Sequence, residues 1–592
     1  MRGLTHRWIE PKVLPTDGVS GAWASAGLDP LVRRVLAARG ITDPDEAARF
    51  CEPSLLEMHD PSLMGGLDVA AERLLRALRA NERVVIYGDY DVDGVSATTI
   101  LWQTLRHLAP ESIAEGRVRA YVPHRLDEGY GINAEALVGF AEEGVGVVVS
   151  VDCGITAVEQ ARVAREAGLD LIVTDHHNPP ADGALPDAFA VVHPRVGGAY
   201  PFGELCGAAV AFKLAWRLLT TEAGSERVGA DARRVLLDGL ALAGLATIAD
   251  VVPLVDENRV IARHGLARVK HTENVGLRAL IEVSGLASKD VGSEEAGYVL
   301  GPRLNACGRL GHAREAVELL TTDDPGRAQE LARHLDKQNR GRRETEKRIF
   351  GEAEERVATL GLDRVDKRSI VLAGEGWHPG VVGIVCSRLV GRYSRPAVLL
   401  CDDGETASGS GRSIDGYNLH GALTHCSDLL TRFGGHDMAA GMGLASSDVP
   451  AFAERMGAHA MEHISEERLT PALRIDCGAE AHELTMACLT QLERVAPFGR
   501  ANPAPSLLMR GLRVRRGAET MGAAGAHMQV RFGDGGSGSL RAVGWRMGEH
   551  AGLLREGMVV DAVVRPTISR WKGQERVELE LRDVRLPDAA LV

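Results

Sequence analysis

The chain has 592 residues, of which 45% are hydrophobic and 25% charged, and its formal net charge is −13 at pH 7. This length exceeds what a single hydrophobic core supports, so we expect several domains. The negative charge argues against a protein that coats nucleic acid through a uniformly basic surface, but it is compatible with a local basic channel, because affinity depends on the particular Lys and Arg residues that meet phosphates.

The sequence carries no sign of a membrane or secreted protein. No apolar run is long enough to span a bilayer, and the first residues, Met1–Trp8, lack the apolar core of a signal peptide. The nine cysteines are scattered singly, without a Cys-x-x-Cys pair, so neither a disulfide framework nor a zinc knuckle is indicated. We therefore expect a cytoplasmic protein with buried, reduced thiols and no membrane partner.

The first part of the chain reads as a helical lead-in followed by an α/β domain. Residues 1–75 are expected to be helical, with helices over Pro30–Arg39 and Pro44–Phe50. Residues 76–255 alternate short β-branched runs with helical patterns, which is typical of a parallel sheet. The last predicted helix of this domain is Ala232–Ile248.

The second part predicts a connecting segment and two further domains. Residues 256–360 contain a turn-rich motif and then a long basic helix over Asp323–Ile349, which either follows a DNA backbone or is a solvated helix with ordinary ion pairs. Residues 361–468 form a second α/β pattern, and in 469–592 short strands with polar turns suggest a small β-barrel. The predicted fold class is α/β, with two α/β domains joined by a long helix and a C-terminal barrel.

Carboxylates and histidines follow the predicted strands at the points where these strands end. Parallel strands end at one edge of their sheet, so side chains from distant parts of the sequence are expected to meet there. Such oxygen-rich sites with imidazole favour Mn²⁺ or Mg²⁺. An acidic surface turn and a calcium loop are the alternatives for the first motif, Asp89-x-Asp91-x-Asp93-Gly94, but the downstream glutamate of an EF-hand is absent. The candidate ligands are Asp89, Asp91, Asp93, Asp152, His176, His177 and Asp250.

The order of these motifs resembles the DHH phosphoesterase superfamily, and the segments that follow resemble its single-strand-specific 5′→3′ DNA exonuclease branch, the RecJ exonucleases. The resemblance begins near residue 80 and reaches the C-terminus. Beyond the acidic motifs it rests on five segments, Thr247–Leu254, Gly301–Arg309, Trp377–Val385, Gly409–Ser413 and Gly434–His436. It implies that the domains are DHH (76–255), DHHA1 (361–468) and OB-like (469–592).

The resemblance implies a centre of two Mn²⁺ ions, with Mg²⁺ as the alternative, and it assigns most of the candidate ligands. The metal ligands would be Asp91, Asp93, Asp152, His176 and Asp250, with Asp152 as the bridge between the ions. Many superfamily members have a histidine where this chain has Tyr87, and the RecJ-like pattern supplies Asp89 instead as a further ligand. His177 is assigned to the scissile phosphate or to a position behind the ligands, and the catalytic set is Asp152, His176, His177 and Asp250.

The resemblance also implies a clamp on the 5′-terminal phosphate, formed by Ser410 and Arg412. Arginines in Gly- and Ser-bounded turns suit phosphate oxygens, because backbone amides in such turns face the same anion. The expected substrate-binding residues are Arg303, Asn305, Arg309, Ser410, Arg412, Gly434, Gly435 and His436.

These expectations combine into one function. The chain is expected to degrade single-stranded DNA from its 5′ end to mononucleotides, by two-metal-ion hydrolysis, in recombination and repair. The alternatives are a DHH-family phosphoesterase acting on short oligonucleotides or cyclic dinucleotides, and a non-catalytic replication scaffold. The resemblance suggests a monomer, with single-strand-binding protein and a RecQ-type helicase as partners.

Overall fold

The computed structural model describes residues 2–11, 27–124, 128–180, 182–533, 538–571 and 573–587. The chain forms two compact units. We call Pro53–Arg342 together with Pro497–Pro503 the N-terminal α/β unit, and Met1–Glu52, Arg343–Ala496 and Ala504–Val592 the C-terminal unit. Within the described residues, no helix has both the length and the apolar character that a bilayer span requires.

The N-terminal α/β unit is built on a five-stranded, fully parallel sheet of order β3-β2-β4-β5-β6. The strands expected from the apolar runs are present, which confirms the predicted parallel sheet. Their bounds are β2 Arg83–Gly88, β3 Val118–Tyr121, β4 Val145–Val151, β5 Asp170–Thr174 and β6 Ala190–Val192.

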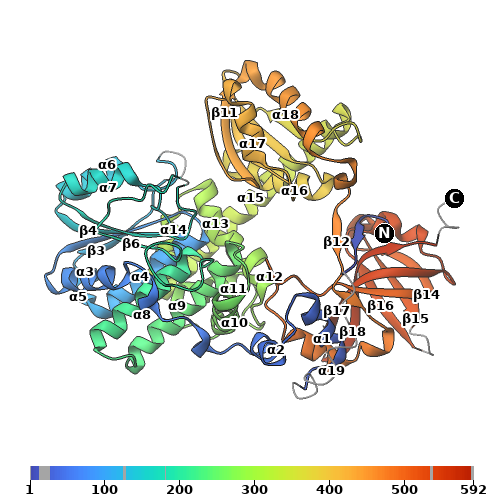
Figure 1. The fold of residues 1–592 in the computed structure, drawn as a ribbon, viewed down its shortest axis with the longest axis horizontal. Coiled ribbons are helices and arrows are strands. Elements are labelled where there is room, and N and C mark those ends of the chain that lie inside the picture. The colour runs from blue at the N-terminus through green and yellow to red at the C-terminus, as the bar shows by residue number, and fades with distance from the viewer. Residues whose placement is uncertain are drawn as a thin grey trace. The chain divides into compact units, whose positions relative to one another are not determined.

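Helices cover both faces of this sheet (Figure 1). Side chains of β4 alternate between the two cores: Val148 packs with α6 and α7 on one face, whereas Val147 and Val149 pack with α3, α4 and α8 on the other. Burial on both faces explains why the strands are almost purely apolar in sequence. The covering helices are α3 Leu67–Arg79, α4 Val92–Leu108, α6 Ala134–Glu142, α7 Val158–Glu166 and α8 Gly207–Ala223.

A helical subdomain follows the sheet and carries the remaining motifs of this unit. The helix predicted over Ala232–Ile248 is confirmed as α9, Ala230–Ala249, and it ends directly before Asp250. The other elements are α5 Pro110–Ala114, α10 Asp256–Val269, α11 Val275–Val283, α12 Ser293–Glu295, the π-helical turn Ala296–Leu300, α13 Gly301–Leu310 and α14 Arg314–Thr321.

The long basic helix is confirmed as α15, which spans Pro325–Leu360 and so continues beyond its predicted end. Several of its charges are paired along the helix: Arg340 pairs with Asp336, and Arg348 with Glu352. These intrahelical pairs favour the interpretation of a solvated, ion-paired helix for this face.

The C-terminal unit contains the second α/β domain and the barrel. The α/β domain has a mixed sheet of order β10-β11-β9-β8-β7, in which only β7 and β8 run parallel. Its elements are β7 Ile370–Gly374, α16 Pro379–Tyr393, β8 Ala397–Asp402, β9 Thr406–Arg412, α17 Leu419–His425, β10 Arg432–Gly435, β11 Ala439–Ala445 and α18 Val449–His463.

The barrel is confirmed, because β14 pairs with both β15 and β17 and so closes the five strands β14-β15-β16-β18-β17. Three of its strands are much longer than the short runs that the sequence suggested, and register shifts in β14 and β17 let them bend around the barrel. The strands are β14 Leu507–Met521, β15 His527–Gly533, β16 Ser539–Gly544, β17 Val559–Trp571 and β18 Gln574–Arg585.

The lead-in contains the two predicted helices, α1 Pro30–Ala38 and α2 Pro44–Cys51. It also contains a strand that the prediction of a purely helical segment missed: β1, Arg7–Ile9, pairs in parallel with β12, Ala472–Arg474. Trp8 on this strand is buried and donates through Nε1 to Asp583, 2.8 Å away.

Candidate metal centre

The register of the parallel sheet brings the predicted acidic residues to one edge. Gly88, Val151 and Thr174 are paired across β2, β4 and β5, so the next residue of each strand, Asp89, Asp152 and Asp175, leaves the sheet at the same level. This is the convergence that the sequence predicted.

The first turn of α4 holds two of the carboxylates. Asp91 caps the helix and accepts from the amides of Asp93 and Gly94, at 2.8 and 3.2 Å. Asp93 is buried, and its two carboxylate oxygens accept from the amides of Gly207 and Ala208, at 2.6 and 2.7 Å. The N-terminus of α8 therefore fixes the Asp93 side chain and compensates part of its charge.

Asp152 occupies a strained position at the end of β4. Its φ of 62° lies in the left-handed region, which costs free energy for any residue other than glycine. It is 2% exposed, and a Cβ atom at position 207 would lie 2.5 Å from its Oδ1, so only glycine fits there. The fold thus holds a buried carboxylate between the sheet and α8.

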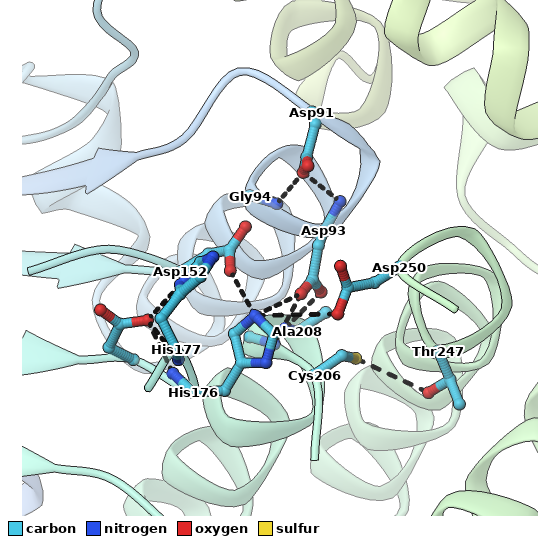
Figure 2. Close-up of polar contacts among 12 residues, drawn as sticks. Asp91, Asp93, Gly94, Asp152, His176, His177, Cys206, Ala208, Thr247 and Asp250 are labelled. Atoms are coloured by element: carbon cyan, nitrogen blue, oxygen red, sulfur yellow. Dashed lines mark hydrogen bonds and ion pairs between the residues drawn. The ribbon is translucent and has the colours of Figure 1, made fainter. Parts of the chain in front are cut away.

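His176 lies at the middle of the cluster (Figure 2). Its Nε2 is 3.1 Å from Asp152 Oδ1, 3.5 Å from Asp93 Oδ2 and 3.7 Å from Asp250 Oδ2. Three overlapping groups have ligand atoms close enough to share an ion, and two of them contain Asp152. They are Asp89–Asp91–Asp152, Asp93–His176–Asp250 and Asp152–His176–His177.

Asp175 and His177 form a supporting pair beside this cluster. Asp175 accepts from the amides of Ile155 and His176 and from His177 Nδ1, the last at 2.7 Å. Burial opposes both charges, yet this contact raises the pKa of His177 to about 9 and lowers that of Asp175 to about 2. Asp175 therefore orients the ring of His177.

The electrostatics of the cluster fit a divalent cation. Burial and the repulsion of neighbouring carboxylates raise the pKa of Asp152 well above its ordinary value, raise that of Asp91, and raise that of Asp250 to about 9. Asp152 Oδ1 and His176 Nε2 are buried without a hydrogen bond. Bound cations would relieve the repulsion among the carboxylates and would give a partner to the two ligand atoms that lack a hydrogen bond.

Tyr87, at the position where the resemblance leads us to expect a histidine in many superfamily members, takes a structural role. Its hydroxyl donates to the carbonyl of Gly131 at 3.0 Å and accepts from the amide of Asn133 at 3.1 Å. Its side chain is fully buried and its hydroxyl is used within the fold, whereas Asp89 is one of the grouped candidates.

Tyr130 is a residue that the sequence did not single out. Its hydroxyl lies 3.2 Å from His177 Nε2, its ring packs edge-on against Tyr90, and more than half of its surface is exposed. An exposed aromatic residue at a metal cluster is a stacking surface for a base. Only the folded loop brings it to His177, so no pattern in the sequence marks it beyond the residue type.

The prediction that Gly301–Arg309 forms turns is wrong. The segment is helix α13, because Pro302 is tolerated in a first helical turn and Gly308 is needed for packing: a Cβ there would lie 2.6 Å from the carbonyl oxygen of Tyr90. Asn305 Oδ1 accepts from the amide of Val92 at 3.0 Å. The helix therefore braces the loop that carries Asp89 and Asp91.

The two arginines of this helix differ in their surroundings. Arg303 pairs with Asp336 of α15 at 3.0 Å and donates to the carbonyl of Val299 at 2.7 Å, so part of its charge is already used within the unit. Arg309 lies in the last turn of α13. Substrate binding by Arg303, Asn305 and Arg309 stays a prediction.

Asn305 supports the loop of two candidate ligands through the hydrogen bond that it accepts from the amide of Val92. Replacing Asn305 by alanine removes the acceptor for the Val92 amide, so we expect Mn²⁺ affinity to fall about tenfold, as for residues behind metal ligands in general, with little change in KM for DNA. Calorimetric titration with Mn²⁺ and steady-state kinetics measure the two effects. A rise in KM without a loss of Mn²⁺ affinity would instead identify Asn305 as a substrate contact.

The proposed 5′-phosphate residues lie together within the C-terminal unit. Ser410 and Arg412 point from the same face of β9 toward Gly383 of α16, where a Cβ would lie 3.4 Å from Ser410 Oγ and 3.2 Å from Arg412 Nη2. Arg412 ends a strand rather than standing in the expected turn. Gly434, Gly441 and Ser410 are paired in one row across β10, β11 and β9. Gly435 follows on the strand, and His436 begins the exposed turn that leads into β11.

Three family models match the chain, and together they cover its α/β domains and its barrel. They are described as DHH family, N-terminal domain (residues 83–243), DHHA1 domain (366–461) and RecJ OB domain (475–583). A single-stranded-DNA-specific exonuclease RecJ of Bacillus subtilis is 40% identical over 576 residues, covering 96% of this chain and 69% of that protein.

Solved structures are similar over nearly the whole length. The crystal structure of RecJ in complex with Mn²⁺ from Thermus thermophilus matches with a TM-score of 0.82 and 30% identity, covering 98% of this chain and 80% of that chain. The Mg²⁺ complex from the same organism matches with a TM-score of 0.76 and 28% identity, covering 98% and 79%.

Proposed function

This chain belongs to the RecJ family of single-stranded-DNA-specific exonucleases, and from this premise we infer a metal-dependent nuclease that hydrolyses single-stranded DNA from its 5′ end and releases 5′-mononucleotides. The observation that carries the activity is the cluster around His176, where three groups of ligand atoms lie close together and Asp152 Oδ1 and His176 Nε2 are buried without a hydrogen bond. The role in recombination and repair is the one consistent with that family.

The grouping of ligand atoms supports an assignment for two ions. Asp89, Asp91 and Asp152 would hold one, Asp93, His176 and Asp250 the other, and Asp152 would be shared. When bound, Mn²⁺ or Mg²⁺ ions supply Lewis acidity, which polarises a phosphodiester and makes water more acidic. The α8 amides at Asp93 and the strained backbone at Asp152 keep these ligands in place before any ion or substrate arrives.

His177 and Tyr130 are proposed to contact the scissile nucleotide. Asp175 holds His177 through Nδ1, and the exposed Tyr130 hydroxyl lies against the same ring, 3.3 Å from Nδ1 and 3.2 Å from Nε2. The imidazole would face a phosphate oxygen and the tyrosine ring a base.

Ser410, Arg412 and the start of α16 are proposed to bind the 5′-terminal phosphate. A hydroxyl, a guanidinium and the amides of a helix N-terminus are hydrogen-bond donors that commonly bind phosphates in proteins. Holding the strand end in this way would set the direction of degradation. Gly434, in register with Ser410, would line the same face, and Gly435 and His436 would contact the DNA strand from the end of β10 and the turn that follows it.

Arg412→Ala tests this clamp. Loss of a charge-assisted hydrogen bond, about 1.5–3 kcal/mol, predicts a KM about 10- to 100-fold higher for strands with a 5′-phosphate. Strands with a 5′-hydroxyl should be affected much less. Arg392→Ala, an exposed arginine at the far end of α16, is the matched control. If KM rises equally for both substrates, Arg412 contacts the DNA strand at a position other than its 5′-terminal phosphate.

The function as a whole is tested by nucleotide release from single strands labelled at either end. With Mn²⁺, the 5′ label should leave first as a mononucleotide and duplex DNA should resist. No release by the wild-type chain would favour a scaffold, and hydrolysis of dinucleotides alone would favour a phosphoesterase of short substrates.

The remaining expectations on partners and location stay proposals. We infer a monomer in the cytoplasm that works with single-strand-binding protein and a RecQ-type helicase. Within the described residues no disulfide joins any of the nine cysteines, as suits a reducing compartment.

A further inference from the structure

The segment Pro497–Pro503 lies far from the acidic motifs in sequence but belongs to the N-terminal α/β unit. It docks on the loop that follows Asp250: the amide of Leu254 donates to the carbonyl of Arg500 at 2.8 Å. Leu254 is buried, and a Cβ at Gly499 would lie 2.8 Å from its Cδ1. The backbone around Arg500 is thus fixed to the polypeptide that carries a metal ligand.

The segment forms a tight, internally braced turn. Gly499 and Asn502 exchange two backbone hydrogen bonds, of 2.9 and 3.2 Å. The buried side chain of Asn502 donates to the carbonyl of Pro497 at 2.8 Å, and Ala501 adopts a left-handed φ of 62°. Such bracing holds the tip of a turn in one position, and the residue at the tip is Arg500.

Arg500 is exposed at the rim of the metal centre. Next to Asp250, Val251 is 58% exposed with a φ of 58°, so this side of the loop faces solvent. The Arg500 charge acts on Asp250 and opposes the rise in the pKa of that carboxyl, which burial and Asp93 dominate. Within the described residues, the Arg500 guanidinium takes part in no ion pair.

We propose that Arg500 binds a phosphate of the DNA strand at the metal centre. The proposal rests on the function inferred above and adds a substrate contact from a segment outside the DHH and DHHA1 motifs. Bound cations would satisfy the carboxylates, which leaves the guanidinium as an exposed fork donor on a braced turn. That is the arrangement in which arginine recognises phosphate.

Two substitutions distinguish the effect of the Arg500 charge from the effect of the position of the turn. Arg500→Ala removes the charge, whereas Gly499→Ala keeps the charge but places a Cβ 2.8 Å from Leu254 Cδ1, so the turn and the Leu254 side chain must move apart. Arg227→Ala is the control: Arg227 is exposed and follows the far end of α8, about 25 Å of helix from Gly207. Thermal unfolding of each variant checks that the fold is kept.

The measurement is the affinity for a non-hydrolysable 5′-phosphorylated oligothymidylate in Mn²⁺, by fluorescence anisotropy at several salt concentrations, together with Mn²⁺-dependent KM and kcat. We expect both variants at the turn to bind about tenfold more weakly, and the slope of log K against log salt to fall by about 0.7, the value for one phosphate contact on a single strand. KM should rise more than kcat falls, and Arg500→Lys should restore part of the affinity.

The outcomes distinguish this proposal from the function on which it rests. If the wild-type chain does not cut single strands, the proposed function fails. If the wild-type chain cuts them and Arg500→Ala matches Arg227→Ala in affinity and salt slope, Arg500 makes no phosphate contact. An unchanged slope with altered Mn²⁺ affinity would show that Arg500 serves Asp250 instead, which also overturns the proposal.

Discussion

Replacement of Asp152 by asparagine is expected to lower kcat for nucleotide release by on the order of 10³-fold or more, because it removes the negative charge that both proposed ions share. The side chain keeps its size, so the packing against Gly207 is retained. Binding of single-stranded DNA in EDTA should persist, since fewer negative charges then face the phosphates. The measurements are Mn²⁺-dependent release, Mn²⁺ stoichiometry by calorimetry, and DNA affinity.

Asp231→Asn is the matched control for this change. Asp231 is an exposed aspartate in the first turn of α9, at the opposite end of the helix from Asp250, and it pairs with Arg234 at the surface. Its substitution should leave release and Mn²⁺ binding as in the wild type. If Asp152→Asn keeps two bound ions and substantial activity, Asp152 is not the shared ligand.

The ligand cluster was predictable because it depends on two regular features, strand length and parallel register. Apolar runs that end at Gly88, Val151 and Thr174 specify where each strand stops, and parallel pairing then aligns the residues that follow. The end of α9 delivers Asp250 by the same reasoning, since the helical pattern of the sequence fixes where the helix stops.

The parts that were not predictable depend on contacts between side chains distant in sequence. The glycines of α13 resemble turn residues until the backbone of Tyr90 is seen beside Gly308. The pairing of β1 with β12 joins three-residue segments too short to show a pattern. Tyr130 and Arg500 acquire their positions only from loops that fold against the metal centre.

A buried ion pair links α8, whose amides hold Asp93, to α10, which follows Asp250. No pattern in the sequence predicts this ion pair. Lys213 of α8 pairs with Glu257 at the start of α10, and both side chains are fully buried. Lys213 also donates to the carbonyl of His59 at 2.6 Å, while Tyr200 and the amide of His59 donate to Glu257. Burial lowers the pKa of Lys213, which Glu257 partly offsets.

Lys213→Met is therefore expected to destabilise the N-terminal α/β unit by about 3–5 kcal/mol, because it leaves a buried carboxylate without its cation. The effect should be local to α8 and α10. Hydrogen exchange of peptides from Gly207–Ala223 and Asp256–Val269 under native conditions measures it directly. We also expect weaker Mn²⁺ binding, since α8 supplies the two amides that hold Asp93.

The double variant Lys213→Met/Glu257→Gln separates the charge from the packing. A neutral glutamine can still accept from the amide of His59 through Oε1 and donate through Nε2 to the hydroxyl oxygen of Tyr200, so we expect the double variant to recover at least about half of the lost stability. If the single and the double variant are equally destabilised, the loss of stability comes from the lost packing of the longer lysine side chain and not from the unpaired charge of Glu257. If neither loses more than about 1 kcal/mol, water reaches Glu257 and the network does not act as a buried brace between the ligand-bearing elements.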